Sequence, residues 1–245
     1  MTELLIGGLA IVAGAFVQAT LGFGIALVAV PVLVLTMPPT LVTPMMVILG
    51  LLNNLVVLAA TWRHVRWRLL LPLVAAGLAG LPLGVLLLKF VDPEPLKLGV
   101  GVLTMLLAVV LLTGWNVRIR RELAGSLAVG AVGGVLHSSV FLSGPPVVLF
   151  LANQGVDKSI FRANIIAFFT LMNVSTILLF CGCALMTPRV VELAAWYTLP
   201  LIAGSLGGVW LGRRINQRLF TRAVLVLVGL VGVMLVVTNV LAMLP

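Results

Sequence analysis

The sequence carries few charges for its length. Asp, Glu, Lys and Arg make up only 9% of its 245 residues, whereas soluble domains carry about 25%. This scarcity excludes a soluble globular domain. Hydrophobic residues make up 62% of the chain and the mean hydropathy is +1.29, which indicates an integral membrane protein. No hydrophilic stretch is long enough for a second domain, so we expect a single transmembrane domain over residues 1–245.

Cysteine and histidine are also scarce, with two of each. Cys181 and Cys183 share no metal-ligand spacing with His64 or His137, so we expect no metal site and no cofactor. Every Asp and Glu lies at or near the end of an apolar segment, so the segment interiors offer no carboxylate for ion coupling. His137 is the one ionisable side chain deep in an apolar segment and is the candidate for proton coupling. A neutral, hydrogen-bonded structural histidine is the alternative.

Two of the apolar segments are interrupted near the middle. About 20 apolar residues cross a bilayer as a helix, and eight segments reach roughly that length. The first is broken by polar and glycine residues at 18–24, and the fifth is broken at 137–146. Polar atoms and irregular backbone inside a membrane are costly, so such breaks usually mark a binding site. The segments are Leu4–Met37, Leu41–Thr61, Leu69–Leu88, Leu96–Gly114, Leu123–Asn153, Ile160–Cys181, Val190–Leu211 and Phe220–Leu244.

The two halves of the chain resemble each other. At an offset of 120 residues Asn53 falls on Asn173 and Gly24 on Gly144, and farther along an offset of 124 aligns two G-x-x-x-G pairs. Such pairs are typical of tight helix packing in membranes. Internal repeats are common in secondary transporters. The sequence therefore predicts a duplicated unit, with repeats over about 4–114 and 123–244.

The distribution of basic residues favours one topology. If all eight segments cross, the 15 Lys and Arg divide seven against eight. If each broken segment enters the membrane and returns to its own side, they divide twelve against three, which is a strong cytoplasmic bias. We therefore predict an all-α polytopic membrane protein that is an inverted repeat. Each half has a re-entrant first segment and three transmembrane helices, and the termini lie outside. Eight full crossings with parallel repeats are the alternative. The predicted cytoplasmic loops are 63–68, 118–121, 158–162 and 213–222.

The breaks have the composition of an anion site. A helix that restarts after Gly24, and another at Pro145, would each point free N–H groups and a positive dipole end at its break. The alternative is that these glycines only allow close helix packing. The polar residues beside them favour a site. The predicted substrate-binding residues are Gln18, Thr20, Gly22, Phe23, Gly24, Asn53, His137, Ser138, Ser139, Ser143, Gly144, Pro145 and Asn173.

Several short motifs resemble, in their order and spacing, those of the sulfite exporter TauE/SafE family of membrane permeases. The resemblance covers nearly the whole chain and implies transport of sulfite, sulfonates, sulfoacetate and related small anions. Many members have three glycines where this chain has Gly22-Phe23-Gly24, so Phe23 fills part of that space. The other motifs are Ser143-Gly144-Pro145-Pro146, Asn153-Gln154-Gly155, Phe161-Arg162-Ala163-Asn164, Gly204-Ser205-Leu206-Gly207-Gly208 and Gly212-Arg213-Arg214.

The preferred function is therefore an alternating-access transporter of a small organosulfur or sulfur oxyanion in the cell inner (plasma) membrane. A passive anion channel is one alternative. An intramembrane enzyme using His137 with Ser138 or Ser139 is another, disfavoured because no carboxylate lies nearby in sequence to orient the base. The expected partners are the anion, the lipid bilayer and a second copy in a homo-oligomer. Nucleic acid is excluded because the basic residues lie in short loops between apolar segments.

Overall fold

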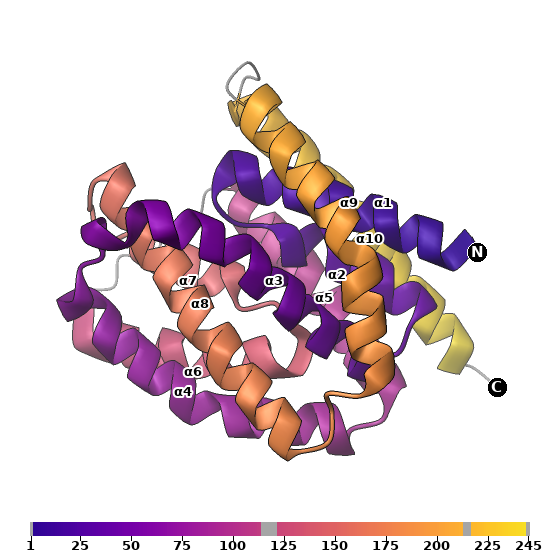
Figure 1. The fold of residues 1–245 in the computed structure, drawn as a ribbon. Helices are drawn as coiled ribbons and strands as arrows, with labels where there is room; N and C mark the ends of the chain where they lie inside the picture. Colours follow the sequence, from indigo (N-terminus) through magenta and orange to yellow (C-terminus); the bar gives the residue numbers. More distant parts are fainter. Residues whose placement is uncertain (1, 114–121, 213–216, 244–245) are drawn as a thin grey trace.

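A computed structural model describes residues 2–113, 122–212 and 217–243, and these residues form helices and loops without a strand (Figure 1). The predicted all-α polytopic fold is confirmed. The predicted loop 118–121 and part of loop 213–222 lie outside the described residues. The helices are α1 (Thr2–Leu21), α2 (Ile25–Thr36), α3 (Pro39–Thr61), η1 (Trp62–His64), α4 (Trp67–Phe90), α5 (Pro93–Thr113), α6 (Glu122–Val140), α7 (Gly144–Ala152), α8 (Lys158–Gly182), α9 (Pro188–Gly212) and α10 (Gln217–Met243).

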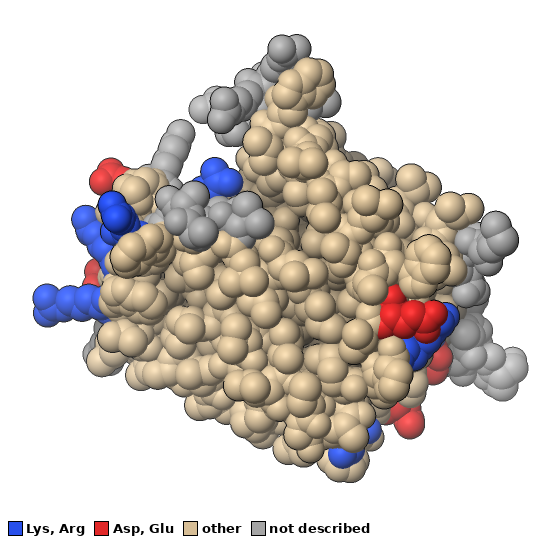
Figure 2. All heavy atoms as spheres, in the orientation of Figure 1, with Lys and Arg blue, Asp and Glu red and all other residues tan. Residues whose placement is uncertain are grey.

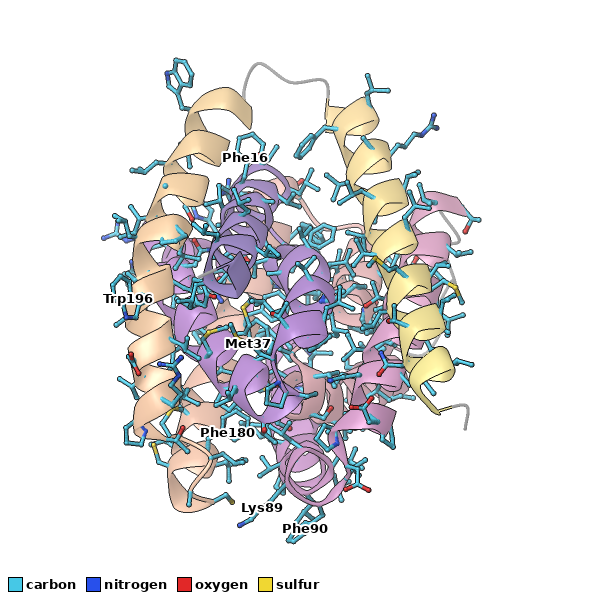
Figure 3. The ribbon with its side chains drawn as sticks, turned by 90° about the vertical axis from the view of Figure 1, so that its right-hand side faces the viewer. Phe16, Met37, Lys89, Phe90, Phe180 and Trp196 are labelled. Atoms are coloured by element: carbon cyan, nitrogen blue, oxygen red, sulfur yellow. The ribbon has the colours of Figure 1, made fainter. Side chains whose placement is uncertain are left out.

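The exterior is that of an integral membrane protein. Seven of the described helices are long and apolar enough to cross a membrane. Large apolar side chains project outward from them, and Trp196 of α9, which is 69% exposed, points away from the bundle in Figure 3. In Figure 2 the charged side chains gather toward two opposite edges of the molecule, with a broad uncharged surface between them. Lys89 and Phe90 lie at the end of the molecule opposite the C-terminal end of α9 (Figure 3), as the predicted charge partition requires.

Each predicted break ends one helix and starts another. α1 stops where Gly22 adopts a φ of 90° and donates its N–H to the Gln18 carbonyl. α6 stops in the same way at Phe141, whose φ is 59°. The Phe141 N–H donates to the His137 carbonyl, which closes the last turn in an αL motif, and the Leu142 N–H donates to the Leu136 carbonyl.

The helices on either side of each break form a hairpin. α2 runs back along α1, so closely that a Cβ added to Gly14 would lie 2.8 Å from the Ile25 carbonyl oxygen. Farther along, a Cβ on Gly7 would lie 3.1 Å from the Leu33 side chain. α7 likewise folds back on α6, with Val147 beside Gly133. Each broken segment therefore returns toward the side from which it starts. This geometry supports the re-entrant interpretation, and the sidedness in a membrane stays a prediction.

The remaining helices pair across the two halves. α4 packs on α6, and α9 packs on α1. A Cβ on Gly80 would collide with the Ala131 carbonyl oxygen, and a Cβ on Gly204 with that of Val12. Val12 and Ala131 are 119 residues apart, and the two glycines are 124 apart. The same kind of close contact is therefore made in both halves, which supports the predicted duplication. Glycine is needed at both places because the backbones of the two helices touch.

The pairing of α3 with α8 bears on the direction of the repeat. Gly50 lies beside Asn173, and the Arg66 N–H donates to Asn164 Oδ1 at 2.9 Å, so the two helices run antiparallel. These helices occupy equivalent places in the two halves. If a two-fold axis relates two antiparallel helices, the axis is perpendicular to both. For helices that cross a membrane, that axis lies in the membrane plane, which is the symmetry of an inverted repeat. The contacts support the inverted repeat, which stays a prediction.

Candidate functional site

The two breaks meet around one central cavity of about 40 Å³. One wall comes from the α1–α2 hairpin and the opposite wall from the α6–α7 hairpin, and α3 and α8 complete the enclosure. The lining residues are Gln18, Phe23, Gly24, Ile25, Ala26, Gly50, Asn54, His137, Phe141, Ser143, Gly144, Phe169 and Asn173. No Asp, Glu, Lys or Arg is among them, so within the described residues the cavity holds a few polar groups in a mostly apolar wall and no fixed charge.

Two helix N-termini open into this cavity. α2 begins after Gly24, whose φ of 117° only glycine adopts readily, and α7 begins after Ser143. Neither N-cap residue places a side-chain hydrogen bond on its helix. The first N–H groups of a helix have no intrahelical acceptor, and the residues that carry them at Ile25, Ala26 and Gly144 line the cavity. The positive ends of two helix dipoles therefore face the same small space, which favours an anion.

Two amide side chains occupy equivalent positions beside these N-termini. Gln18 Nε2 donates to Asn54 Oδ1 at 3.0 Å, and His137 Nε2 lies 3.1 Å from Asn173 Oδ1. The partners in each pair are 36 residues apart, and each residue of the first pair precedes its counterpart by 119. Asn54, and not Asn53, thus takes the position equivalent to Asn173. One residue along a helix rotates the side chain by about 100°, and Asn53 accordingly faces a different cavity.

The second amide leaves a donor unpaired inside the protein. Asn173 Oδ1 is an acceptor, so the facing His137 Nε2 carries the proton, and Nδ1 then accepts from the Ser143 hydroxyl at 2.8 Å. Asn173 is fully buried and its Nδ2 has no partner among the described residues. A buried donor without an acceptor is destabilising by about 1–3 kcal/mol. Asn54 lines the same cavity and likewise uses its Oδ1 as an acceptor, from Gln18.

Comparison with known families decides what kind of protein this is. The sequence profile described as "Sulfite exporter TauE/SafE" matches residues 6–235. The chain belongs to this family. TauE/SafE proteins are membrane transporters and not enzymes, so the predictions of a permease and of no enzymatic activity are confirmed. No curated protein and no solved structure matches the chain.

Aromatic side chains close the site of this TauE/SafE member. The His137 imidazole lies 5.0 Å from the ring of Phe141 and is nearly parallel to that of Phe169, at 6.4 Å. Gly50 makes room for them, since a Cβ there would lie 2.7 Å from Phe141. The sequence did not indicate Phe141 or Phe169, because a phenylalanine in an apolar run is indistinguishable from one that faces lipid.

Several predicted residues lie outside the central cavity. Thr20, Ser138 and Ser139 donate their hydroxyls to main-chain carbonyls of a preceding turn, Ser138 also to that of Leu81. Serine and threonine hydroxyls within helices commonly donate to a carbonyl of the preceding turn. Neither Ser138 nor Ser139 is hydrogen-bonded to His137, so the nucleophile–base pair of the disfavoured enzyme alternative does not form in this structure. Pro145 occupies the first turn of α7, as expected of proline, and contributes no cavity lining.

Gly22 and Asn53 line a second, larger cavity of about 360 Å³ next to the first. Gln18 borders both cavities. In the larger one, Asn53 Oδ1 accepts from the Ser205 hydroxyl at 2.8 Å. The structure therefore divides the predicted site residues into a central set, a set in this side cavity, a set of hydroxyls that only bond the backbone, and Pro145, which only starts α7.

Proposed function

We propose that this protein transports a small sulfur oxyanion, either sulfite or a compact organosulfonate such as sulfoacetate, by alternating access. The anion would bind near mid-membrane in the central cavity. One observation carries the proposal: two uncapped helix N-termini face each other across a cavity that also holds the unpaired, buried Nδ2 of Asn173. The family supports a sulfur anion as the class of substrate.

The size of the cavity favours a small head group. One water needs about 10–15 Å³ of such space, so about 40 Å³ suits an anion with a few heavy atoms. Phe23, Phe141 and Phe169 form its apolar walls. Sulfite and the sulfonate group itself fit this description, and a longer organic substituent would have to extend beyond the central cavity.

Neutral donors are suited to transport as well as to binding. Amide N–H groups and helix dipoles attract an anion with hydrogen bonds and partial charges. A buried Lys or Arg would hold the anion more strongly and slow its release. The predicted donors to the sulfur oxyanion are the N–H groups of Ile25, Ala26 and Gly144 with the amides of Asn54 and Asn173.

His137 is the proposed proton-coupling residue. Both ring nitrogens already have partners, Ser143 and Asn173, so the imidazole is held at the edge of the cavity in one orientation. Protonation of Nδ1 would place a positive charge beside the anion and would turn the Ser143 hydroxyl from donor to acceptor. A passive channel would not need this step. Flux into liposomes with and without a pH gradient separates coupled transport from a channel.

The proposal is tested first by binding. The purified protein is screened by thermal shift against sulfite, thiosulfate, sulfoacetate and taurine, with sulfate and acetate as controls. A ligand that binds the folded state at 100 times its Kd stabilises it by about 2.7 kcal/mol. We expect sulfite or sulfoacetate to raise the melting temperature more than acetate does. A shift with carboxylates alone would contradict the organosulfur assignment.

The predicted orientation belongs to the same proposal. The cytoplasmic side of the inner membrane would hold the ends of the helices near Arg63, Arg66, Arg68 and Arg162, and the termini would lie outside. Reporter fusions at the two termini test this arrangement. A fluorescent cytoplasmic reporter at either terminus would contradict it.

A further inference from the structure

The larger side cavity lies between α1, α3, α8 and α9, directly beyond Gln18. Most of its wall is apolar, including Leu201 and Leu206, but a few polar side chains line it as well. Among them, Asn53 and Ser205 form a hydrogen-bonded pair. Arg162 also lines the cavity, is exposed, and has no ion-pair or hydrogen-bond partner among the described residues. Polar side chains together with one unpaired cation are suited to the passage of an anion.

The equivalent region in the other half is filled. At the 119-residue offset, Asn53 corresponds to Met172 and Gly22 to Phe141. Met172 is fully buried, and its Sδ lies 3.0 Å from the position that a Cβ on Gly77 would take. Phe141 is also buried, whereas Gly22 leaves open space around itself.

A hydrogen bond also closes the filled side. The Ser138 hydroxyl, on α6, donates to the Leu81 carbonyl of α4 at 2.7 Å. Its counterpart in the first half is Ala19, which has no hydroxyl and lines the open cavity. The two halves share one plan, and yet one side of the central cavity is open and the other is packed shut.

We infer that the side cavity is the water-filled vestibule through which the anion reaches the central site from the side of Arg162, and that Gln18 is the gate between the two. The region around Met172 and Leu81 would open as the matching vestibule when the transporter faces the other side. This inference rests on the proposed transport function. It adds a specific path, a gate and an open side to the binding site.

The repeat supplies a matched pair of probes. Asn53→Cys and Met172→Cys are made in a background where Cys181 and Cys183 are replaced by serine. Each is treated with an anionic, membrane-impermeant methanethiosulfonate in right-side-out and in inside-out vesicles. We expect the Asn53→Cys protein to react from the Arg162 side. The Met172→Cys protein should react about tenfold more slowly or more, and from the opposite side, because the other state is a minor one.

Two results would overturn the inference. Equal reaction of the two cysteines from the same side would remove the asymmetry. Reaction of Asn53→Cys with a lipophilic maleimide but not with the charged reagent would show a lipid-filled groove. Ser205→Cys and Leu81→Cys are a second pair at the 124-residue offset, and they decide the question if Met172→Cys does not fold. Sulfite binding is measured separately by thermal shift. The labelling experiment can therefore contradict the vestibule without contradicting the substrate assignment, and the reverse also holds.

Discussion

The two halves of this transporter use one backbone plan with different side chains. In each, a helix ends at a residue with positive φ, a second helix starts three residues later, and an asparagine on the next helix faces the gap. The first half places Gly22 and Gln18 in this frame, and the second half places Phe141 and His137 at the same positions. Of these four residues, only His137 of the second half can gain a charge.

This difference suggests that the two halves have different roles in transport. The α1–α2 side is adaptable, because Gly22 leaves space and Gln18 makes a single side-chain hydrogen bond, which it donates to Asn54 Oδ1. The α6–α7 side is locked, because the His137 ring is bonded at both nitrogens and flanked by two phenylalanines. In the proposed mechanism the shared frame would form the anion site, and the side chains that differ would decide which side opens and whether protons are coupled.

The largest effect is expected where the halves are the same. Asn54→Asp and Asn173→Asp each keep the acceptor oxygen and replace an N–H donor with a carboxylate oxygen. A hydrogen bond to a charged group contributes about 1.5–3 kcal/mol, and repulsion adds to its loss. We expect sulfite affinity to fall by about 100-fold in either variant. Isothermal titration of the purified protein measures the change.

Asn239→Asp is the control for this pair. Asn239 is also a buried asparagine but lies on α10, where its Nδ2 donates to the Leu235 carbonyl and does not line the cavity. Its sulfite affinity should stay within about twofold of wild type. A loss in only one of the two site variants would break the proposed equivalence of the halves.

The next largest effect is on stability and concerns the backbone at the starts of α2 and α7, where the two halves differ. Gly24 has a φ of 117°, and an added Cβ would lie 2.9 Å from Val17. Gly144 lacks a positive φ, and its Cβ would lie 3.9 Å from Phe169. Gly24→Ala should therefore destabilise the protein by about 1–3 kcal/mol, and Gly144→Ala by less than about 0.5 kcal/mol. Thermal unfolding in detergent compares them, and equal losses would contradict the strain assigned to Gly24.

Exchange of the central side chains sharpens the comparison further. His137→Gln gives both halves the same neutral amide. If His137 couples protons, this variant should still bind sulfite, but its uptake into liposomes should no longer respond to a pH gradient. Gln18→His is the reciprocal variant and should keep the response. Unchanged gradient-driven uptake by His137→Gln would assign the imidazole a purely structural role.

The sequence predicted the plan of the fold better than the details of the site. The breaks at 18–24 and 137–146 stood out because glycine, proline and polar residues are conspicuous in apolar runs, and the hairpins followed from counting basic residues. Which of Asn53 and Asn54 faces the cavity could not be predicted. α3 is apolar on nearly every side, so its sequence has no period that identifies an inner face.

The sequence did not predict the aromatic walls of the cavity or the partners of the hydroxyl groups, for other reasons. A left-handed conformation is rare for phenylalanine, so nothing in the sequence indicated that Phe141 would end α6 and turn its ring into the cavity. The hydroxyls of Thr20 and Ser139 looked like substrate contacts. They satisfy carbonyls of their own helix instead, and composition alone does not distinguish these two uses.

The smallest expected effect is on stability. It distinguishes a hydroxyl that bonds the imidazole from one that bonds only its own helix. Ser143→Ala removes the donor to His137 Nδ1 and leaves that buried nitrogen without a partner, so we expect a loss of about 1 kcal/mol in stability. Ser139→Ala removes only a bond to the Val135 carbonyl, which keeps its place in the helix, and should cost less than about 0.5 kcal/mol. Thermal unfolding measures both. If Ser139→Ala is the more destabilising variant, the imidazole is not anchored through Ser143, and the contrast between a locked and an adaptable half loses its main support.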